Sequence, residues 1–372
     1  MNISYDNSTD EFFSTNVTNA FWITTTETKL LCRCKDRSPG VPIAQILWGG
    51  AAFLSNILIV IAIFRFKALR SRKEYVIVGG LALADSLEGL ATMMAGTYRS
   101  YGIITGWYCT CVTKLFCMST PQSWLWKWTE FATAFMLCAV STDRLIAVSF
   151  PLKYYRYGRP YAYKMVGGVY AFAFLNMCVS WYYPIVNRHK YMTAYCSTGS
   201  TIAKLYYQYS KYTCSVASMM SCVIFGLVVI KFYFYQKGRV AGSVPGKAGE
   251  AQKEKQARAQ RQLTITLGIS SACTLLLDSI PRAYGISIEF NKKVNIFGSY
   301  KGYVFQMTKL NAIANFFLYA FRQKEMKMAL LALLTCTRMP HDVTMWEDSK
   351  SKKPNSNVEM SNVSRSKRPS VV

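Results

Sequence analysis

The sequence predicts an all-α membrane protein, a seven-transmembrane helix bundle with a short interfacial helix after the seventh span. Apolar residues make up 51% of the 372 residues and aromatic residues 15%, and they come in long blocks. A helix that crosses a bilayer needs roughly 20 mostly apolar residues. Seven blocks of about that length occur, at 43–65, 75–97, 116–148, 164–186, 206–232, 261–286 and 299–321. Seven such blocks would overfill the core of a soluble domain, so a soluble protein is excluded.

The placement of Lys and Arg predicts a multi-pass orientation in the plasma membrane. With span ends included, the loops after the first, third and fifth spans and the tail from Arg322 hold 28 of the 44 basic residues. Basic loops stay cytoplasmic, so we expect the N-terminus outside the cell and the C-terminus inside. The net charge of +25 then reflects this bias and attraction to the lipid bilayer. No nucleic-acid partner is expected, because no soluble basic domain is predicted.

Four segments follow from this topology. We expect an extracellular tail over 1–42, the seven-helix bundle over 43–322, an amphipathic interfacial helix over 323–336 and a disordered cytoplasmic tail over 337–372. The first residues lack the apolar core of a signal peptide, so the first span is expected to direct its own insertion. The tail carries three sequons, which predict glycosylation at Asn2, Asn7 and Asn16.

Charged and polar motifs close the third and seventh spans. Asp143-Arg144-Leu145, with Pro151-Leu152 after it, resembles the end of the third helix in rhodopsin-like (class A) G-protein-coupled receptors, which usually have Asp-Arg-Tyr. Asn315 to Tyr319 is similar to the family's Asn-Pro-x-x-Tyr, with Phe316 in place of Pro. Nematode serpentine chemoreceptors of the SX class similarly keep Asp-Arg-Leu-Ile-Ala-Val. A helix end with a snorkelling Arg is the alternative interpretation.

The resemblance implies a receptor for an extracellular ligand, either a chemosensory small molecule or a peptide, that activates a heterotrimeric G protein. Arg144 would leave Asp143 to contact the G protein, while Tyr319 swings toward Arg144. Pro281 lies inside the sixth span, where proline kinks a helix and provides a pivot. The Trp that the family usually places before this proline is absent, with Ser279 at that position. Arrestin is a further expected partner at the same face.

A set of polar residues lies within the apolar spans. An isolated carboxylate such as Asp85 must find partners inside the bundle. The resemblance implies a buried network, often linked to a sodium ion, and so a possible Na⁺ site at Asp85. Ordinary helix–helix hydrogen bonds without a switching role are the alternative. The residues expected in this network are Asn56, Asp85, Thr133 and Asn311, with Asn315 within reach.

Charged residues in the third and sixth spans are candidates for ligand contact. Lys127 and Glu130 are three residues apart and share a helix face, so they can pair. Glu130 is 14 residues before Arg144, about four helical turns, so both point the same way. Asp278 and Arg282 are four residues apart and can also pair. Purely structural ion pairs are the alternative, as is an aromatic belt for Trp126. The Asp of amine receptors falls near Trp126, which disfavours a biogenic amine.

Lys309 lies six residues before Asn315, the spacing of the retinal-binding lysine in opsins. An opsin-like photoreceptor is therefore an alternative function. Against retinal, the Trp that packs it is absent from the sixth span, and Gln122 occupies the usual counter-ion position. Glu130 or Asp278 would have to replace that counter-ion. We expect Lys309 to contact the ligand or to form an ion pair, with no cofactor bound.

Six of the 12 cysteines fall in segments expected outside the cell, where disulfides form. The resemblance ties Cys196, in the second outer loop, to the top of the third helix, with Cys117 or Cys111 as its partner. Cys32 and Cys34 are too close for an easy mutual bond, and either can reach Cys109 or Cys111. The other six residues are Cys138, Cys178, Cys214, Cys222, Cys273 and Cys336, the last a palmitoylation candidate.

Other functions have less support. The chain-terminal Ser370-Val371-Val372 fits a PDZ-domain ligand. A transporter or channel is the rival class, but no internal repeat or pair of broken helices is present. An enzyme is not expected, because His189 and His341 are the only histidines and no metal or nucleophile constellation accompanies them.

Overall fold

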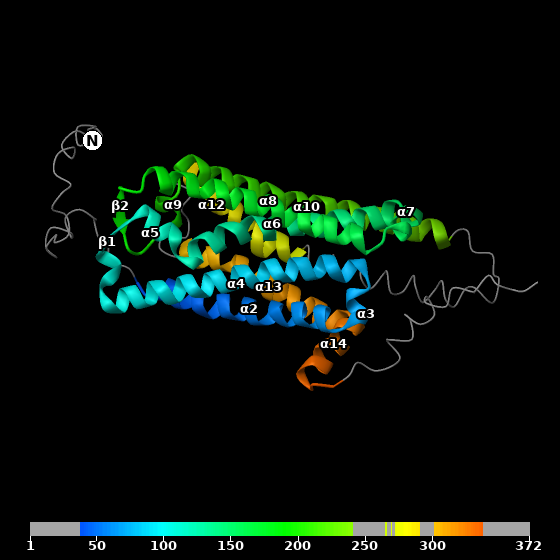
Figure 1. Cartoon of the computed structure of the whole chain (residues 1–372). Helices are drawn as coiled ribbons and strands as arrows, with labels where there is room; N and C mark the ends of the chain where they lie inside the picture. The colour runs from blue at the N-terminus through cyan, green and yellow to red at the C-terminus, as the bar shows by residue number, and fades with distance from the viewer. Residues whose placement is uncertain (1–37, 241–264, 266–268, 270–271, 291–300, 338–372) are drawn as a thin grey trace, which may run out of the picture.

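The computed structural model describes residues 38–240, 265, 269, 272–290 and 301–337 (Figure 1). The sequons at Asn2, Asn7 and Asn16, the tail cysteines Cys32 and Cys34, and the chain-terminal PDZ motif lie outside the described residues.

Five helices of the described part are long and apolar enough to cross a membrane. They are α2 (Gly40–Arg65), α4 (Lys73–Thr105), α6 (Pro121–Ser149), α8 (Arg159–Val186) and the part Lys204–Phe234 of α10 (Lys204–Val240). The sixth predicted span contains a π-helical turn, η2 (Leu275–Ser279), followed by α12 (Ile280–Phe290). The seventh corresponds to α13 (Lys301–Arg322). The helices agree with the predicted seven-helix bundle.

The long helices lie side by side, with α6 at the centre against α4, α8 and α10 (Figure 1). At one end, strands β1 (Cys111–Thr113) and β2 (Tyr191–Thr193) pair antiparallel beside the short helices α5 (Lys114–Ser119) and α9 (Thr198–Thr201). We call it the disulfide end. The opposite end, the Arg144 end, carries α3 (Lys67–Arg70), α7 (Pro151–Arg156) and α14 (Lys324–Leu334).

The third span begins later than its apolar block predicts. The block starts at residue 116, but α5 ends at Ser119 and α6 begins at Pro121. Proline disfavours helical backbone in the residue before it, and Thr120 is accordingly extended, with φ −66° and ψ 134°. Pro121 itself fits the first turn of a helix, where its missing N–H costs nothing. Cys117 therefore lies on a separate short helix and not on α6.

Glycines allow α2 and α4 to pack backbone against backbone. A Cβ atom on Gly89 would lie 2.6 Å from the Phe53 backbone nitrogen and 2.8 Å from the Gly49 carbonyl oxygen. A Cβ atom on Gly49 would meet the Met93 backbone nitrogen at 2.6 Å. Small residues at a helix interface permit this close approach inside a membrane. The contact sets the position of the polar face of α4 relative to α2.

The Gly89→Ala variant is expected to destabilise the folded protein by about 1–3 kcal/mol, because the added methyl group overlaps backbone that cannot move aside. Gly167→Ala on α8 is the matched control, since nothing lies within 4 Å of its Cβ position. Thermal unfolding of the two purified variants in detergent measures the difference. Equal midpoints would contradict the close packing of α2 and α4.

Candidate functional site

Apart from Asp143–Arg144 at the helix end, the described residues form three buried ion pairs inside the bundle. On α6, Lys127 Nζ lies 2.7 Å from Glu130 Oε2. At the junction of η2 and α12, Arg282 Nε lies 2.8 Å from Asp278 Oδ1. The third pair joins two helices, because Lys309 on α13 donates to the carboxylate of a residue on α4. We call these six residues the ion-pair cluster: Lys127, Glu130, Asp278, Arg282, Lys309 and Glu88.

Glu88 is the member that the sequence did not assign. For an opsin-like Lys309, the sequence offered Glu130 or Asp278 as the counter-ion, but each of these is bonded to a basic residue three or four positions along its own span. Glu88 lies one helical turn beyond Asp85, a spacing that places both carboxylates on the same side of α4. This spacing was the feature of the sequence that could have identified Glu88 as a residue facing the bundle interior. The partner itself depends on how α4 and α13 face each other.

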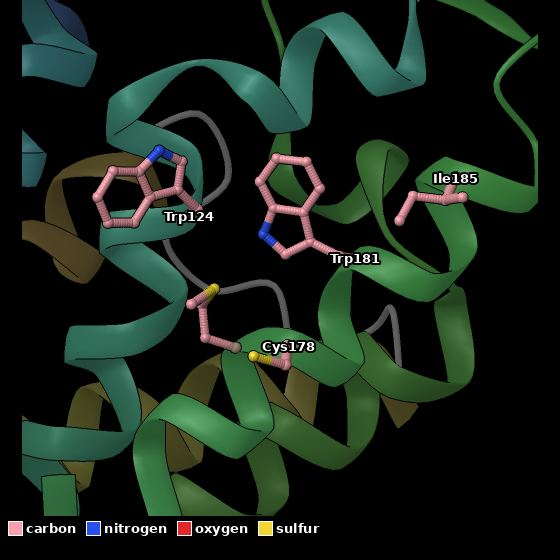
Figure 2. A pocket seen from close by; sticks show the side chains of 5 residues that line it. Trp124, Cys178, Trp181 and Ile185 are labelled. Atoms are coloured by element: carbon pink, nitrogen blue, oxygen red, sulfur yellow. The ribbon is translucent and has the colours of Figure 1, made fainter. Parts of the chain in front are cut away.

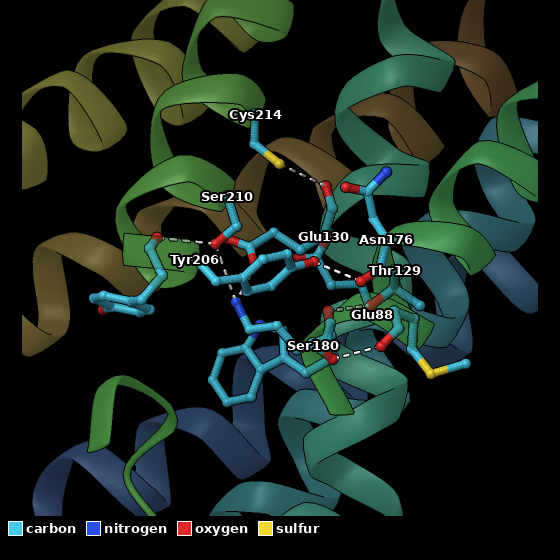
Figure 3. Close-up of polar contacts among 12 residues, drawn as sticks. Glu88, Thr129, Glu130, Asn176, Ser180, Tyr206, Ser210 and Cys214 are labelled. Carbon is cyan, nitrogen blue, oxygen red and sulfur yellow. Dashed lines mark hydrogen bonds and ion pairs between the residues drawn. The ribbon is translucent and has the colours of Figure 1, made fainter. Parts of the chain in front are cut away.

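Helix α10 supplies hydroxyl groups to two of the pairs. Lys127 Nζ also donates to Ser210 Oγ at 3.4 Å. Ser218 Oγ donates to Asp278 Oδ2 at 2.7 Å. Figure 3 shows Ser210 and Cys214 on α10 facing Glu130, whose backbone oxygen lies 3.6 Å from the Cys214 sulfur. The cluster is therefore lined by polar atoms on α10 as well as by its own charges.

Trp126 lies close to two cations. Lys309 Nζ is 5.9 Å from the Trp126 ring centroid, and Arg99 Cζ on α4 is 5.8 Å from it. An aromatic ring attracts a cation over its face. Arg99 also lies 5.0 Å from the Tyr195 ring and donates to the Cys196 carbonyl oxygen at 3.4 Å. These contacts connect the ion-pair cluster to the loop at the disulfide end.

That loop is fixed by the Cys117–Cys196 disulfide, with the two Cα atoms 5.3 Å apart. Of the two alternatives for the partner of Cys196, Cys117 is confirmed and Cys111 is wrong. Cys109 and Cys111 are each disulfide-bonded as well. The pairing with β2 places Cys111 opposite Thr193, and not opposite Cys196.

The predicted polar network is divided among several contacts. Asp85 on α4 and Asn315 on α13 are both buried in the interior of the bundle. Asn56 Nδ2 donates to the Ala312 carbonyl oxygen at 3.2 Å, which joins α2 to α13. Asn311 Oδ1 accepts from Thr274 Oγ1 at 3.2 Å, a contact toward η2. Thr133 Oγ1 is buried and has no hydrogen-bond partner among the described residues.

At the Arg144 end, Arg144 Nη2 lies 3.2 Å from Asp143 Oδ2. The same carboxylate oxygen accepts from Tyr154 on α7 at 3.1 Å, and Tyr154 also reaches Glu74 Oε1 at 3.3 Å. Burial is the main cause that raises the pKa of Tyr154 above its ordinary value, so its phenol stays protonated and donates. Tyr154 was not a predicted site residue. It lies in the basic loop, ten residues after Arg144, and its contact depends on the fold of α7.

In the region predicted to act as a pivot, a π-helical turn ends at Ser279, two residues before Pro281. A proline cannot donate to the carbonyl four residues earlier, and π turns are one way to absorb that loss. Ser279, in place of the family's Trp, lies in this turn with its oxygen 2.7 Å from Ser218 Oγ. Tyr319 on α13 is buried, and its hydroxyl has no hydrogen-bond partner in the described part of the chain.

A cavity of about 370 Å³ lies apart from these residues, between α6 and α8 (Figure 2). It is lined by apolar side chains and a free cysteine: Trp124, Met177, Cys178, Trp181 and Ile185. None of the predicted ligand residues lines it. The predicted ligand residues lie instead in the ion-pair cluster and beside it.

Residues 55–319 match the family model of the 7 transmembrane receptor (rhodopsin family). The chain belongs to this family. It is thus a multi-pass receptor of the plasma membrane and not an enzyme. The prediction of a class A receptor is confirmed, while the likeness to nematode SX chemoreceptors stays a prediction.

Curated relatives share this architecture. Mouse trace amine-associated receptor 9 is 26% identical over 314 residues, which cover 74% of this chain and 80% of that receptor. Rat trace amine-associated receptor 9 is 25% identical over 74% of this chain and 82% of the relative. Rat trace amine-associated receptor 8b is 28% identical over 63% of this chain and 69% of the relative. The similarity extends over most of both chains.

The Glu88→Gln variant is expected to lower the stability of this receptor by about 3–5 kcal/mol, because it leaves the Lys309 ammonium buried without its counter-charge. The double variant Glu88→Gln, Lys309→Met removes both charges and is expected to recover most of that loss. Thermal unfolding midpoints of the purified receptors measure the coupling between the two positions. If the double variant lost as much stability as Glu88→Gln and Lys309→Met lose separately, added together, the ion pair would not be formed.

Proposed function

We propose that this receptor binds an extracellular ligand at the ion-pair cluster and activates a heterotrimeric G protein at the Arg144 end. The N-terminus lies outside the cell and the C-terminus inside, in accord with the basic residues concentrated on the Arg144 side. The observation that carries the proposal is the Asp143–Arg144 pair, buried at the end of α6 and closed by Tyr154. Burying a charge pair in a membrane protein costs free energy, so its presence at a helix end favours a functional role.

The route from ligand to G protein runs through α10 and η2. Asp278 and Ser279 in η2, which ends two residues before Pro281, are both hydrogen-bonded to Ser218 on α10. A ligand that competes for Asp278 changes the contacts of this turn, and so favours a different position of α12. Such a ligand shifts the equilibrium only by its difference in affinity for the two states. In the active state Arg144 leaves Asp143 and contacts the G protein, with arrestin using the same face.

The names of the relatives suggest a trace amine as one ligand class. This chain differs at the position that carries Asp in amine receptors, where it has Trp126 close to Arg99 and Lys309. Trp126 supplies no carboxylate to bind an ammonium group at that position. The ligand class is therefore expected to differ from that of an amine receptor.

A sodium ion at Asp85 is compatible with the residues present. Asp85 Oδ2 on α4 and Thr133 Oγ1 on α6 are buried oxygen atoms that accept no hydrogen bond from the described residues. Oxygen ligands of this kind suit a hard cation. Asp85 and Thr133 would hold the ion, which would stabilise the inactive arrangement. Retinal fits less well, because Lys309 is already bonded to Glu88 and Ser279 replaces the packing Trp.

Arg144→Ala is expected to lower G-protein nucleotide exchange by between about 5- and 150-fold, the usual size of a coupling between sites. Exchange is measured without added ligand in membranes with matched surface expression, in the dark and in light. Arg188→Ala, which removes an exposed guanidinium at the disulfide end, is the control and should retain exchange. Equal exchange in wild type and Arg144→Ala would refute the coupling role.

Tyr154→Phe is expected to raise ligand-independent exchange several-fold, because Asp143 loses a donor that holds the inactive arrangement. The ring remains, so the contact with Lys73 Nζ, 3.5 Å from the ring centroid, is kept. The same exchange assay measures the change. Exchange at or below the wild-type level would show that Tyr154 does not restrain Arg144.

A further inference from the structure

The two ion pairs formed within single segments have the same polarity along the bundle. On α6, which runs from the disulfide end to the Arg144 end, Lys127 precedes Glu130 and lies nearer the disulfide end. The sixth span runs in the opposite direction, so Arg282 on α12 lies nearer the disulfide end than Asp278. Both pairs present a cation toward the disulfide end and a carboxylate one turn deeper.

Neither ion pair itself joins two helices, although Lys127 and Asp278 each also bond to a serine on α10. Each joins residues on consecutive turns of one segment, so its breakage would not separate α6 from a neighbour. Buried ion pairs also contribute little to stability, since the cost of removing two charges from water offsets their attraction. Their location in the interior, with hydroxyls of Ser210 and Ser218 beside them, points instead to ligand recognition.

The cluster is balanced in charge, with three basic and three acidic side chains. A ligand with a single charge would take one member of a pair and leave the other buried without a partner. A ligand with both charges can replace a pair by two new pairs, so that every charge remains compensated. The site therefore selects against a plain amine and against a plain carboxylate.

We propose that the ligand of this receptor is a zwitterion of the amino-acid type, bound with its ammonium group toward Glu130 and its carboxylate toward Lys127. The inference rests on the proposed function, because it names the ligand class of that same site. The ligand enters from the disulfide end with its ammonium group leading, as the polarity of the pairs requires. Arg282 and Asp278 present a second pair of the same polarity, through which the ligand reaches η2. Trp126 borders the site, with Arg99 and Lys309 close to its ring.

The test uses the purified full-length receptor and three matched sets of probes. The first set is the standard protein amino acids and longer zwitterions such as γ-aminobutyrate. The second set holds the corresponding amines without a carboxylate, and the third the corresponding acids without an amine. Binding is measured as a ligand-dependent shift of the thermal unfolding midpoint. For at least one zwitterion we expect an affinity at least about tenfold higher than for its amine and its acid, since a site with paired polar groups rejects analogues that lack a partner.

Two variants test the orientation. In Glu130→Gln the ammonium anchor is lost, so the zwitterion and its acid are expected to bind within about threefold of each other. In Lys127→Met the zwitterion and its amine should become similar. The exchanged pair Lys127→Glu, Glu130→Lys keeps both charges and covers the case in which a single variant does not fold. Glu325→Gln removes an ion pair with Arg72 at the Arg144 end and should leave the ligand preference unchanged.

G-protein exchange, measured in parallel, separates the two proposals. A zwitterion that shifts the midpoint but does not change exchange would support the ligand class and refute the coupling. Exchange driven by an amine or an acid, with no zwitterion bound, would support the coupling and overturn the ligand class. If no zwitterion shifted the thermal unfolding midpoint, the proposed ligand class would be overturned too. An unchanged preference for the zwitterion over its amine and its acid in Glu130→Gln and Lys127→Met would have the same consequence.

Discussion

The free-energy cost of burying charge determines how the charged side chains of this receptor are paired. A bundle that crosses a membrane cannot leave an ionised side chain without a partner, because neither lipid nor packed protein solvates it. The structure meets this requirement with pairs at two levels: the ion-pair cluster toward the disulfide end, and Asp143 with Arg144 at the opposite end. Between the two levels lie neutral polar groups around Asp85. The ion pairs at either level can exchange partners only if another charged or polar group comes close enough to replace the lost partner.

This constraint explains why ligand binding and G-protein coupling can be linked. At the cluster, an incoming charged group can replace an existing partner. At the Arg144 end, Arg144 can leave Asp143 if an incoming protein supplies new contacts for it. At the ion-pair cluster, Ser218 on α10 bonds to both Asp278 and Ser279 of the π-helical turn. Coupling of this kind requires only two arrangements of the sixth span, which differ in the partners of its charged and polar residues.

Contacts between residues close together in the sequence could be predicted, whereas contacts between distant segments could not. The pairs Lys127–Glu130 and Asp278–Arg282 follow from helical spacing, because residues three or four apart must be neighbours. The pair between Lys309 and Glu88 joins residues 221 positions apart, and no local rule specifies it. The choice of Cys117 over Cys111 likewise depended on the pairing of β1 with β2.

Two local features were also hidden by the apolar pattern. The break at Thr120 interrupts a block that remains apolar on both sides, so hydropathy extends the third span too far, although Pro121 marks the break. The π turn before Pro281 is a matter of backbone register, which the bonds of Ser218 to Asp278 and Ser279 help to hold. In both places a proline alters the helix at a point that later bears on function. Pro121 places Cys117 on its own helix beneath the loop of the disulfide end, and Pro281 places the pivot directly beside a charged pair. A ligand that exchanges partners with that pair therefore acts on a part of the sixth span, Leu275–Ser279, whose backbone departs from regular α-helix.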